Sequence, residues 1–315
     1  MTTRLTGPVF ACVVVCSATC EPSEGPRIRQ QDRAATTALP AGQTLALAPR
    51  ALWWRANREG PYLVSPRFGP TAGRLLASGR VGRGLFLVER DQRPRALDSE
   101  YRGPARFGLR GTVCLSEGAL GHRVVLALTE GVRRSARPGE CEPPPGDGDL
   151  GRILYEDGSR RVIHNAMRGT IVIDDTGRGP VVVEERTPWS VRVSQNGRRV
   201  AYVVGSLGAP TLYVHDDDHG RRRLGRGAYP VWFPDGRTLI FAVPGPLVRR
   251  GGHSTVHASE LHAWDAVAGN AWALTNTADL AEMQPAVAPD GGAVAFSDWR
   301  YGGLYIVPVT RRQQP

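Results

Sequence analysis

The stretch best suited to binding a metal ion is an acidic run between two histidines, His215-Asp-Asp-Asp-His219. Carboxylate and imidazole groups are ligands for divalent cations. However, alternate residues of a strand point to opposite faces, and this run falls between two predicted strands, where Asp suits a turn. No Asp-x-Asn-x-Asp-Gly calcium loop is formed. We therefore interpret the run as a turn and predict no metal site and no cofactor.

Three further histidines, His253, His257 and His262, cluster in a second polar segment. His257 and His262 straddle a predicted strand start, so a helical pair of ligands is not indicated, and a zinc site also needs a third ligand in a defined place. The neighbouring carboxylates Asp174-Asp175 and Glu184-Glu185 would face apart in strands. The sequence also lacks a Gly-x-Ser-x-Gly nucleophile elbow. We therefore predict no catalytic residues.

Three arginines, Arg67, Arg106 and Arg192, share one position of a repeated phrase, where two other copies have Val231 and Ala286. Guanidinium groups bind carboxylate and phosphate groups bidentately. If the three converge on the mouth of a channel, they form a site for an anion or an acidic peptide. The alternative is that their stems lie over the protein surface.

Trp299-Arg-Tyr301 combines two aromatic rings with an arginine. Aromatic residues and arginine are common at interaction hot spots, so we add Trp299 and Tyr301 to the candidate binding residues. The alternative is that such rings wedge between structural units.

The repeated phrase is clearest at Tyr229-Pro-Val-Trp-Phe-Pro-Asp-Gly-Arg-Thr-Leu-Ile-Phe241, which predicts a strand, a tight turn and a second strand. Fifty-five residues later it returns as Gln284-Pro-Ala-Val-Ala-Pro-Asp-Gly-Gly-Ala-Val-Ala-Phe296. With weaker copies upstream, the turn glycines fall at 73, 111, 158, 197, 236 and 291. A four-stranded propeller blade takes about 40–45 residues. The two longer gaps then hold inserted loops, Glu130–Leu150 and Gly245–Ser259.

Each copy is followed by a third apolar strand, a polar turn and a short fourth strand. The sequence therefore predicts an all-β fold, a six-bladed β-propeller of four-stranded antiparallel blades. The last copy ends before a fourth strand, and Thr44-Leu-Ala-Leu-Ala48 is expected to supply it. This N-terminal strand would close the ring and leave few exposed edges.

The phrase resembles the TolB-like β-propeller repeat, whose consensus runs Pro-x-Trp-Ser-Pro-Asp-Gly-x-x-Ile-Ala-Phe and then Leu-Tyr-Val-x-Asp. The resemblance covers residues 60–310 and is strongest in the last three copies. It implies the propeller fold and makes a cell-envelope partner plausible. The chain lacks room for the mixed α/β domain that precedes the propeller in TolB itself, so the resemblance does not transfer that protein's function.

The start of the chain has the layout of a secretory signal: Arg4, an apolar stretch from Pro8 to Cys16, and small residues before Cys20. Ser17-Ala-Thr-Cys20 resembles a bacterial lipobox, although Ser17 and Thr19 depart from its pattern. We expect a signal peptide of lipoprotein type at 1–19, lipidation of Cys20, a flexible tether at 20–40 and the propeller at 41–315. The alternative is ordinary secretion without a lipid.

Two cysteines, Cys114 and Cys141, remain in the mature chain. An exported protein meets an oxidising compartment, where paired thiols are joined. We expect a disulfide that pins the first inserted loop to its own blade. The alternative is two separate thiols, one of them buried as a small apolar group.

The formal net charge of +10 would suit a nucleic acid or an anionic surface. All 40 basic residues are arginine, which, with the abundant Ala, Gly and Pro, indicates a coding bias rather than a basic binding surface. We therefore predict no nucleic-acid partner.

Together these observations favour a monomeric, exported, lipid-anchored protein of the periplasm or outer membrane. Its expected role is a non-enzymatic scaffold that binds a protein or an envelope component. The alternative is a hydrolase or lyase that acts on a glycan or peptide at the central channel.

Overall fold

The computed structural model describes residues 43–48, 51–54, 61–79, 83–101, 105–108, 112–117, 122–128, 132–136, 141, 147–148, 151–165, 168–250 and 253–313. The predicted signal peptide and tether, with Cys20, lie outside these residues, and so does the side chain of Arg106. The described chain is all-β, and no part of it is a helix long and apolar enough to cross a membrane.

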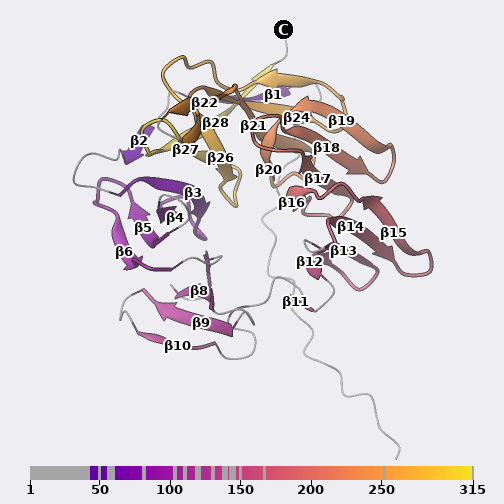
Figure 1. The fold of residues 1–315 in the computed structure, drawn as a ribbon, viewed down its shortest axis with the longest axis horizontal. Coiled ribbons are helices and arrows are strands. Elements are labelled where there is room, and N and C mark those ends of the chain that lie inside the picture. Colours follow the sequence, from indigo (N-terminus) through magenta and orange to yellow (C-terminus); the bar gives the residue numbers. More distant parts are fainter. Residues whose placement is uncertain are drawn as a thin grey trace, which may run out of the picture. The chain divides into compact units, whose positions relative to one another are not determined.

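Antiparallel sheets of four or five strands follow one another along the described chain (Figure 1). Sheet one contains β3 (Leu63–Phe68), β4 (Arg74–Gly79), β5 (Leu85–Glu89) and β6 (Arg95–Asp98). Sheet two contains β7 (Ala105–Phe107), β8 (Thr112–Glu117), β9 (His122–Ala127) and β10 (Arg133–Ser135). Sheet three contains β11 (Asp147–Gly148), β12 (Gly151–Glu156), β13 (Arg160–Asn165), β14 (Thr170–Asp175) and β15 (Gly179–Glu184).

The C-terminal half repeats the pattern in its part of the described chain. Sheet four contains β16 (Trp189–Val193), β17 (Arg199–Val204), β18 (Thr211–Asp216) and β19 (Gly220–Arg226). Sheet five contains β20 (Ala228–Trp232), β21 (Thr238–Pro244), β24 (Ser259–Asp265) and β25 (Ala271–Ala273). Sheet six contains β26 (Glu282–Val287), β27 (Ala293–Asp298) and β28 (Gly303–Gln313). The predicted loop Gly245–Ser259 instead carries a hairpin of β22 (Leu247–Arg250) and β23 (His253–Val256).

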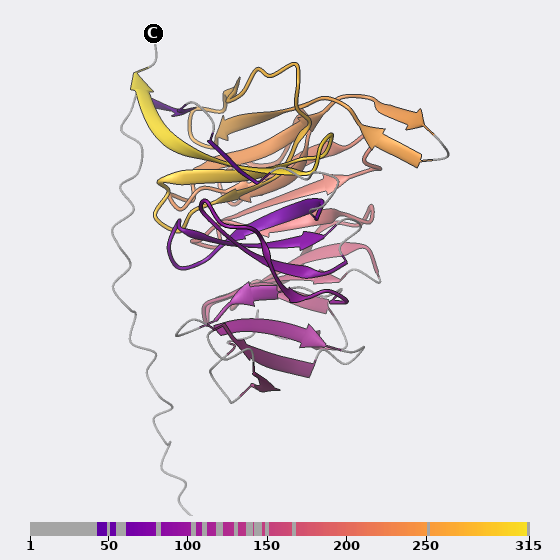
Figure 2. The same cartoon turned by 90° about the vertical axis from the view of Figure 1, so that its left-hand side faces the viewer.

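Sheet six is completed by the N-terminal part of the chain. β1 (Gln43–Leu47) pairs antiparallel with the far half of β28, so that Gln43 lies opposite Gln313. β2 (Ala51–Trp54) pairs with the near half of β28. Figure 2 shows the indigo N-terminal segment next to the long yellow strand β28. The predicted closing strand is therefore confirmed.

Apolar clusters lie between successive sheets, and this arrangement is that of a β-propeller. Leu63 of sheet one packs with Ala295 and Ile306 of sheet six. Ile240 of sheet five packs with Phe296 of sheet six. Similar clusters join sheets one and two, three and four, and four and five. Among the described residues, no such cluster joins sheets two and three.

The first strand of four sheets contains a bulge with a left-handed residue that is not glycine. These residues are Ser65, Ser190, Tyr229 and Gln284, with φ between 51° and 53°. Each lies where the pairing with the second strand shifts register. Left-handed backbone costs such residues about 1–2 kcal/mol, and strain of this kind clusters at functional sites. The bulges therefore direct attention to the first strands.

The predicted Pro-Asp-Gly turns pack against the neighbouring sheet. Gly291 has φ of +72°, and a Cβ at this position would lie 2.9 Å from the ring of Phe233. Phe233 belongs to the equivalent turn of sheet five, where its N–H donates to Thr238 O (2.8 Å). The glycine is thus needed both for its backbone conformation and for the approach of two turns.

We expect Gly291→Ala to lower the free energy of unfolding by about 2 kcal/mol, because left-handed strain adds to overpacking. Gly220→Ala is the matched control, since Gly220 has φ of +67° and nothing within 4 Å of its missing Cβ. It should show only the backbone cost of about 1 kcal/mol. Urea unfolding of both variants checks this, and equal losses would contradict the packing role of Gly291.

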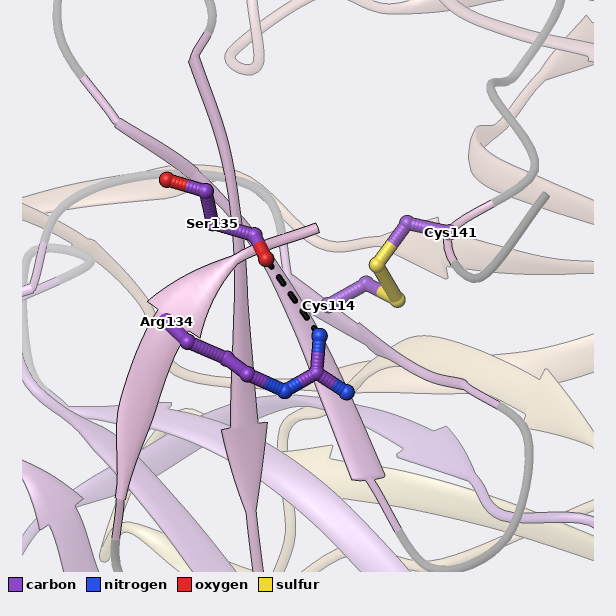
Figure 3. Close-up of a disulfide and its surroundings, with 4 residues drawn as sticks. All are labelled: Cys114, Arg134, Ser135 and Cys141. Carbon is purple, nitrogen blue, oxygen red and sulfur yellow. Dashed lines mark hydrogen bonds between the residues drawn. A yellow bond between two sulfur atoms is a disulfide. The ribbon is translucent and has the colours of Figure 1, made fainter. Parts of the chain in front are cut away.

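Cys114 on β8 and Cys141 are joined by a disulfide, with their Cα atoms 5.8 Å apart (Figure 3). Both residues are buried, and they form a small cluster with Val125 of β9. Figure 3 also shows Arg134 of β10, whose Nη1 donates to Ser135 O (3.3 Å). The disulfide attaches the segment after β10 to the middle of sheet two.

Candidate functional site

Three aromatic side chains from three sheets contact one another in series, and we call them the aromatic ladder: Trp189, Tyr229 and Trp299. The rings of Trp189 and Tyr229 meet edge to face, with centroids 5.4 Å apart. The rings of Tyr229 and Trp299 are tilted, with centroids 5.8 Å apart. Burial raises the pKa of the Tyr229 phenol to about 12, so this group is neutral at physiological pH. Aromatic pairs at such spacings stabilise one another.

Gln284, the bulge residue of sheet six, connects this ladder to sheet one. Its Oε1 accepts hydrogen bonds from the backbone N–H of Ser65 (2.8 Å), from Ser297 Oγ (3.2 Å) and from Trp299 Nε1 (3.2 Å). Ser65 is itself the bulge residue of sheet one. Two of the four strained positions are therefore in direct contact, and a third, Tyr229, is linked to them through Trp299.

The loop between β27 and β28 carries the exposed end of the site. Asp298 Oδ1 accepts from the N–H groups of Ala281 (3.1 Å) and Arg300 (2.9 Å), and Gly302 N–H donates to Asp298 O (2.8 Å). Tyr301 is 47% exposed, and the Arg300 guanidinium lies over its ring at 5.1 Å. The loop thus presents an arginine and a tyrosine to solvent from a hydrogen-bonded backbone.

Both aromatic residues that the sequence singled out lie at this site, in different environments. Trp299 is half-buried, because its ring packs in the aromatic ladder and its Nε1 is bonded to Gln284. Tyr301 faces solvent. We infer that Trp299 supports the loop, whereas Tyr301 is available for contact.

Two of the candidate arginines, Arg67 and Arg192, occupy equivalent positions just after the bulges. Arg67 lies opposite Leu76 and Arg192 opposite Ala201, as Val231 lies opposite Ile240. Arg67 and Arg192 are exposed. Arg67 Nη1 donates to Ala105 O of the next sheet, and Arg192 Nη1 donates to Val191 O (2.9 Å).

Arg106 lies in β7 opposite Cys114. Its side chain is outside the described residues, so convergence of the three guanidinium groups stays a prediction. All three arginines lie on the first strand of their respective sheets.

The acidic run lies at the end of β18 and in the turn that follows. Asp216 is buried, and its carboxylate pairs with Arg199 Nε (2.5 Å) and accepts from the N–H of Asp218 (2.9 Å). Burial raises the pKa of Asp216, but hydrogen bonds from Asp218, Arg199 and His219, together with the charge of Arg199, outweigh burial and hold the pKa below its usual value. Asp216, Asp218 and His219 have ligand atoms within 4.8 Å of one another. The buried member of this group already has an arginine partner.

The same ion pair recurs in other sheets, which gives the run a structural explanation. In each case an arginine at, or directly before, the start of one strand pairs with the acidic residue that ends the next strand of the same sheet. The other examples are Arg74–Glu89 (2.8 Å), Arg160–Asp175 (3.2 Å) and Arg237–Asp265 (2.5 Å). The Arg199–Asp216 pair is therefore one copy of an ion pair that occurs in several of the repeated sheets.

The two described histidines of the second polar segment have separate surroundings. His262 lies in β24, where its ring contacts Phe241 at 5.9 Å and burial lowers its pKa. His257 lies between β23 and β24. The side chain of His253 is outside the described residues.

Sequence reasoning missed Trp189, Tyr229 and Gln284. Tyr229 and Gln284 stand immediately before the proline of the repeated phrase, and Ser65 does so in the first copy. Residues before proline avoid the right-handed helical region, and in three of the copies the bulge residue stands directly before a proline. That proline was the signal that could have identified Ser65, Tyr229 and Gln284 as unusual backbone positions.

No protein-family model matches the chain. Among solved structures, the chain is similar to a protein assigned as TolB from Agrobacterium tumefaciens, with a TM-score of 0.47 and 14% identity over 80% of this chain and 91% of that one. TolB from Acinetobacter baumannii gives a TM-score of 0.37 and 15% identity over 79% of this chain and 64% of that one. The β-propeller domain of Cps50 (Swd1) from Myceliophteria thermophila gives 0.42 and 11% over 83% and 100%. These similarities concern the fold.

Proposed function

We propose that the chain is an exported, lipid-anchored propeller that binds a protein or another envelope component without transforming it. The signal-like start and Ser17-Ala-Thr-Cys20 support export and an anchor on Cys20. The buried disulfide between Cys114 and Cys141 agrees with an oxidising compartment.

The observation that carries the binding role is the Trp299–Tyr301 loop. A contact residue contributes most when its backbone is already fixed, because less conformational entropy is lost on binding. Tyr301 is exposed and packs under Arg300, while Asp298 and the aromatic ladder hold the loop behind it. Tyrosine and arginine on a rigid support are typical of hot spots.

Site-specific photocrosslinking tests this role in the full chain. A photoreactive residue in place of Tyr301 should capture a discrete partner in the cell envelope. The matched control is Val267, which is 66% exposed. It lies in the turn between β24 and β25, at the opposite end of the strands from the position that the Tyr301 turn occupies in sheet six. The same products from both positions, or none from 301, would contradict the proposal.

Mass spectrometry of the same material examines the anchor and the partner together. The mass of the mature N-terminus should show an acylated Cys20, and Cys20→Ser should move the protein out of the membrane fraction. Membrane retention without acylation would refute the lipid anchor and leave the binding role standing.

Arg67, Arg106 and Arg192 are a second proposed surface, for a carboxylate or phosphate group of the partner. The position of all three on first strands, and the equivalent register and exposure of Arg67 and Arg192, support it. Replacing all three with glutamine should weaken partner capture at residue 301 when the partner is acidic. Undiminished capture would remove this surface from the proposal.

A further inference from the structure

A buried pair of carboxyl groups lies where sheets five and six meet. Glu282 begins β26 and is 0% exposed. Glu260, near the start of β24, is half-buried. The segment 274–281, which we call the connector, joins the two sheets and brings Thr275 and Thr277 to both carboxyl groups. Nothing in the proposed binding role uses these residues.

The hydrogen bonds of Thr275 reveal where a proton must be. Its Oγ1 lies 2.8 Å from the N–H of Leu261, 2.8 Å from Glu260 Oε2, and at short hydrogen-bonding distance from Glu282 Oε2. A hydroxyl group has one proton to donate and two lone pairs to accept with. The Leu261 N–H occupies one lone pair. The hydroxyl can therefore donate to only one carboxyl group, and the other must be protonated and donate to it.

The surroundings assign this proton to Glu282. Glu260 Oε1 accepts from the N–H of Thr277 (2.7 Å) and the side chain reaches solvent, so it can carry the negative charge. Glu282 has no solvent contact, and its Oε1 accepts from Thr277 Oγ1 (3.0 Å). Burial, together with the charge of Glu260, raises the pKa of Glu282 to about 7.

Other ionisable groups surround Glu282 on the elements packed against it. Asp298 of β27 lies directly opposite in the strand register, and burial raises its pKa as well. Of the described residues, the ionisable side chains on the elements packed against β26, with those of the connector and the following loop, are Glu260, His262 and Asp265 on β24, Asp298 on β27, Tyr229 on β20, Arg67 on β3, Asp279 in the connector, and Arg300 and Tyr301 in the loop after β27. Of these, Glu260 is the one whose charge contributes to the raised pKa of Glu282. The negative charge of Glu260 therefore opposes the ionisation of Glu282, which would add a second negative charge at this junction.

The connector is hydrogen-bonded to the Trp299–Tyr301 loop. Ala281, its last residue, donates its N–H to Asp298 Oδ1 (3.1 Å) and accepts at its O from Trp299 N–H (2.8 Å). Ala281 also precedes Glu282 in the chain. A displacement of Glu282 would therefore be passed to the loop through two backbone hydrogen bonds.

We propose that Glu282 is a proton-operated latch, which in its neutral form holds the connector to Glu260 through Thr275 and which releases it on ionisation. When Glu282 loses its proton to solvent, two carboxylates compete for the single proton of Thr275. One contact to the connector is then lost, and the loop that depends on Ala281 becomes less ordered.

The direction of the pH effect follows from the proton counts. An unfolded glutamic acid loses its proton near its ordinary pKa of 4.5, whereas Glu282 in the folded protein keeps it until about 7. Between these values the folded state binds the extra proton, so stability falls as the pH rises. Above the pKa that Glu282 has in the folded protein, its ionisation causes no further change of stability with pH.

The test compares the unfolding midpoint of the full chain and of Glu282→Gln from about pH 5 to about pH 8. The amide keeps a donor for Thr275 and an acceptor for Thr277 but cannot ionise. The wild type should lose several degrees over this range, and the variant should lose much less and be the more stable at the alkaline end. A loss of stability in Glu282→Gln that is equal at every pH would overturn the latch.

Two further measurements keep the result decisive. Hydrogen exchange corrected for its intrinsic pH dependence should quicken in the connector and in the Trp299–Tyr301 loop as the pH rises, in the wild type alone. If Glu282→Gln does not fold, a carboxyl carbon NMR titration of the wild type replaces it. Proton loss from Glu282 at an ordinary glutamic-acid pKa would overturn the proposal.

Discussion

Arg199→Met is expected to lower the free energy of unfolding by about 3 kcal/mol, because it leaves the buried Asp216 carboxylate without its cation. The Arg199 side chain is 12% exposed and Asp216 is 2% exposed. Arg199 Nη1 also donates to Gly236 O (3.1 Å) in the turn of the next sheet. Replacing Arg199 therefore removes both the ion pair with Asp216 and a hydrogen bond between sheets four and five.

Arg198→Met is the matched control, since the neighbouring Arg198 is 51% exposed and pairs with the exposed Asp218. It should change the stability by no more than about 0.5 kcal/mol. The pKa of Asp216 lies below its ordinary value, so the contribution of the pair is complete above that value and is lost as the pH falls through the folded pKa. Denaturant unfolding should thus show a difference between the Arg199 variant and the wild type that shrinks in acid. A difference independent of pH would contradict this account.

Replacing both Cys114 and Cys141 with serine should lower the free energy of unfolding by about 3–4 kcal/mol. This follows from the entropy of an unfolded chain that is no longer closed over 27 residues. The effect should be concentrated in sheet two, where the described residues form no apolar cluster with sheet three. The measurement is thermal unfolding of the double variant beside the wild type with and without reductant.

The reductant provides the internal control. Reduced wild type and the double variant should unfold at the same temperature, and reductant should not change the double variant. A double variant as stable as the oxidised wild type would show that packing around Val125 holds this segment without the covalent bond.

The strands and turns of the fold could be predicted because they depend on local residue patterns that recur. Pro234-Asp235-Gly236 folds as a turn since Asp235 Oδ1 accepts from the N–H groups of Arg237 and Thr238 (both 2.8 Å). The closing strand β1 could also be predicted, because the last copy lacked a fourth strand. The hairpin β22–β23 was predicted only as an inserted loop, since its four-residue strands have no copy elsewhere in the chain to compare with.

The site was less predictable, because its residues are brought together by bulges rather than by periodic positions. A register shift at Tyr229 or Gln284 reverses which face of the sheet the following residues occupy, and no simple alternation records this. Trp299 and Tyr301 stood out by residue type. Their different roles depend on Tyr229, a residue 70 positions earlier than Trp299. The protonation of Glu282 required the actual geometry around Thr275.

The pairing of β1 with β28 has a mechanical consequence. Gln43 lies opposite Gln313, whereas β28 is attached to the rest of sheet six from its other end, at Gly303. A pull on the chain ahead of β1 therefore loads the two strands in shear, along their length, and all the hydrogen bonds between them resist together. The hydrogen bonds would break one at a time only if β28 were attached to the rest of the sheet at its Gln313 end, next to the point where β1 is pulled. A tether ahead of β1 would therefore transmit tension to the propeller through two strands that are loaded in shear.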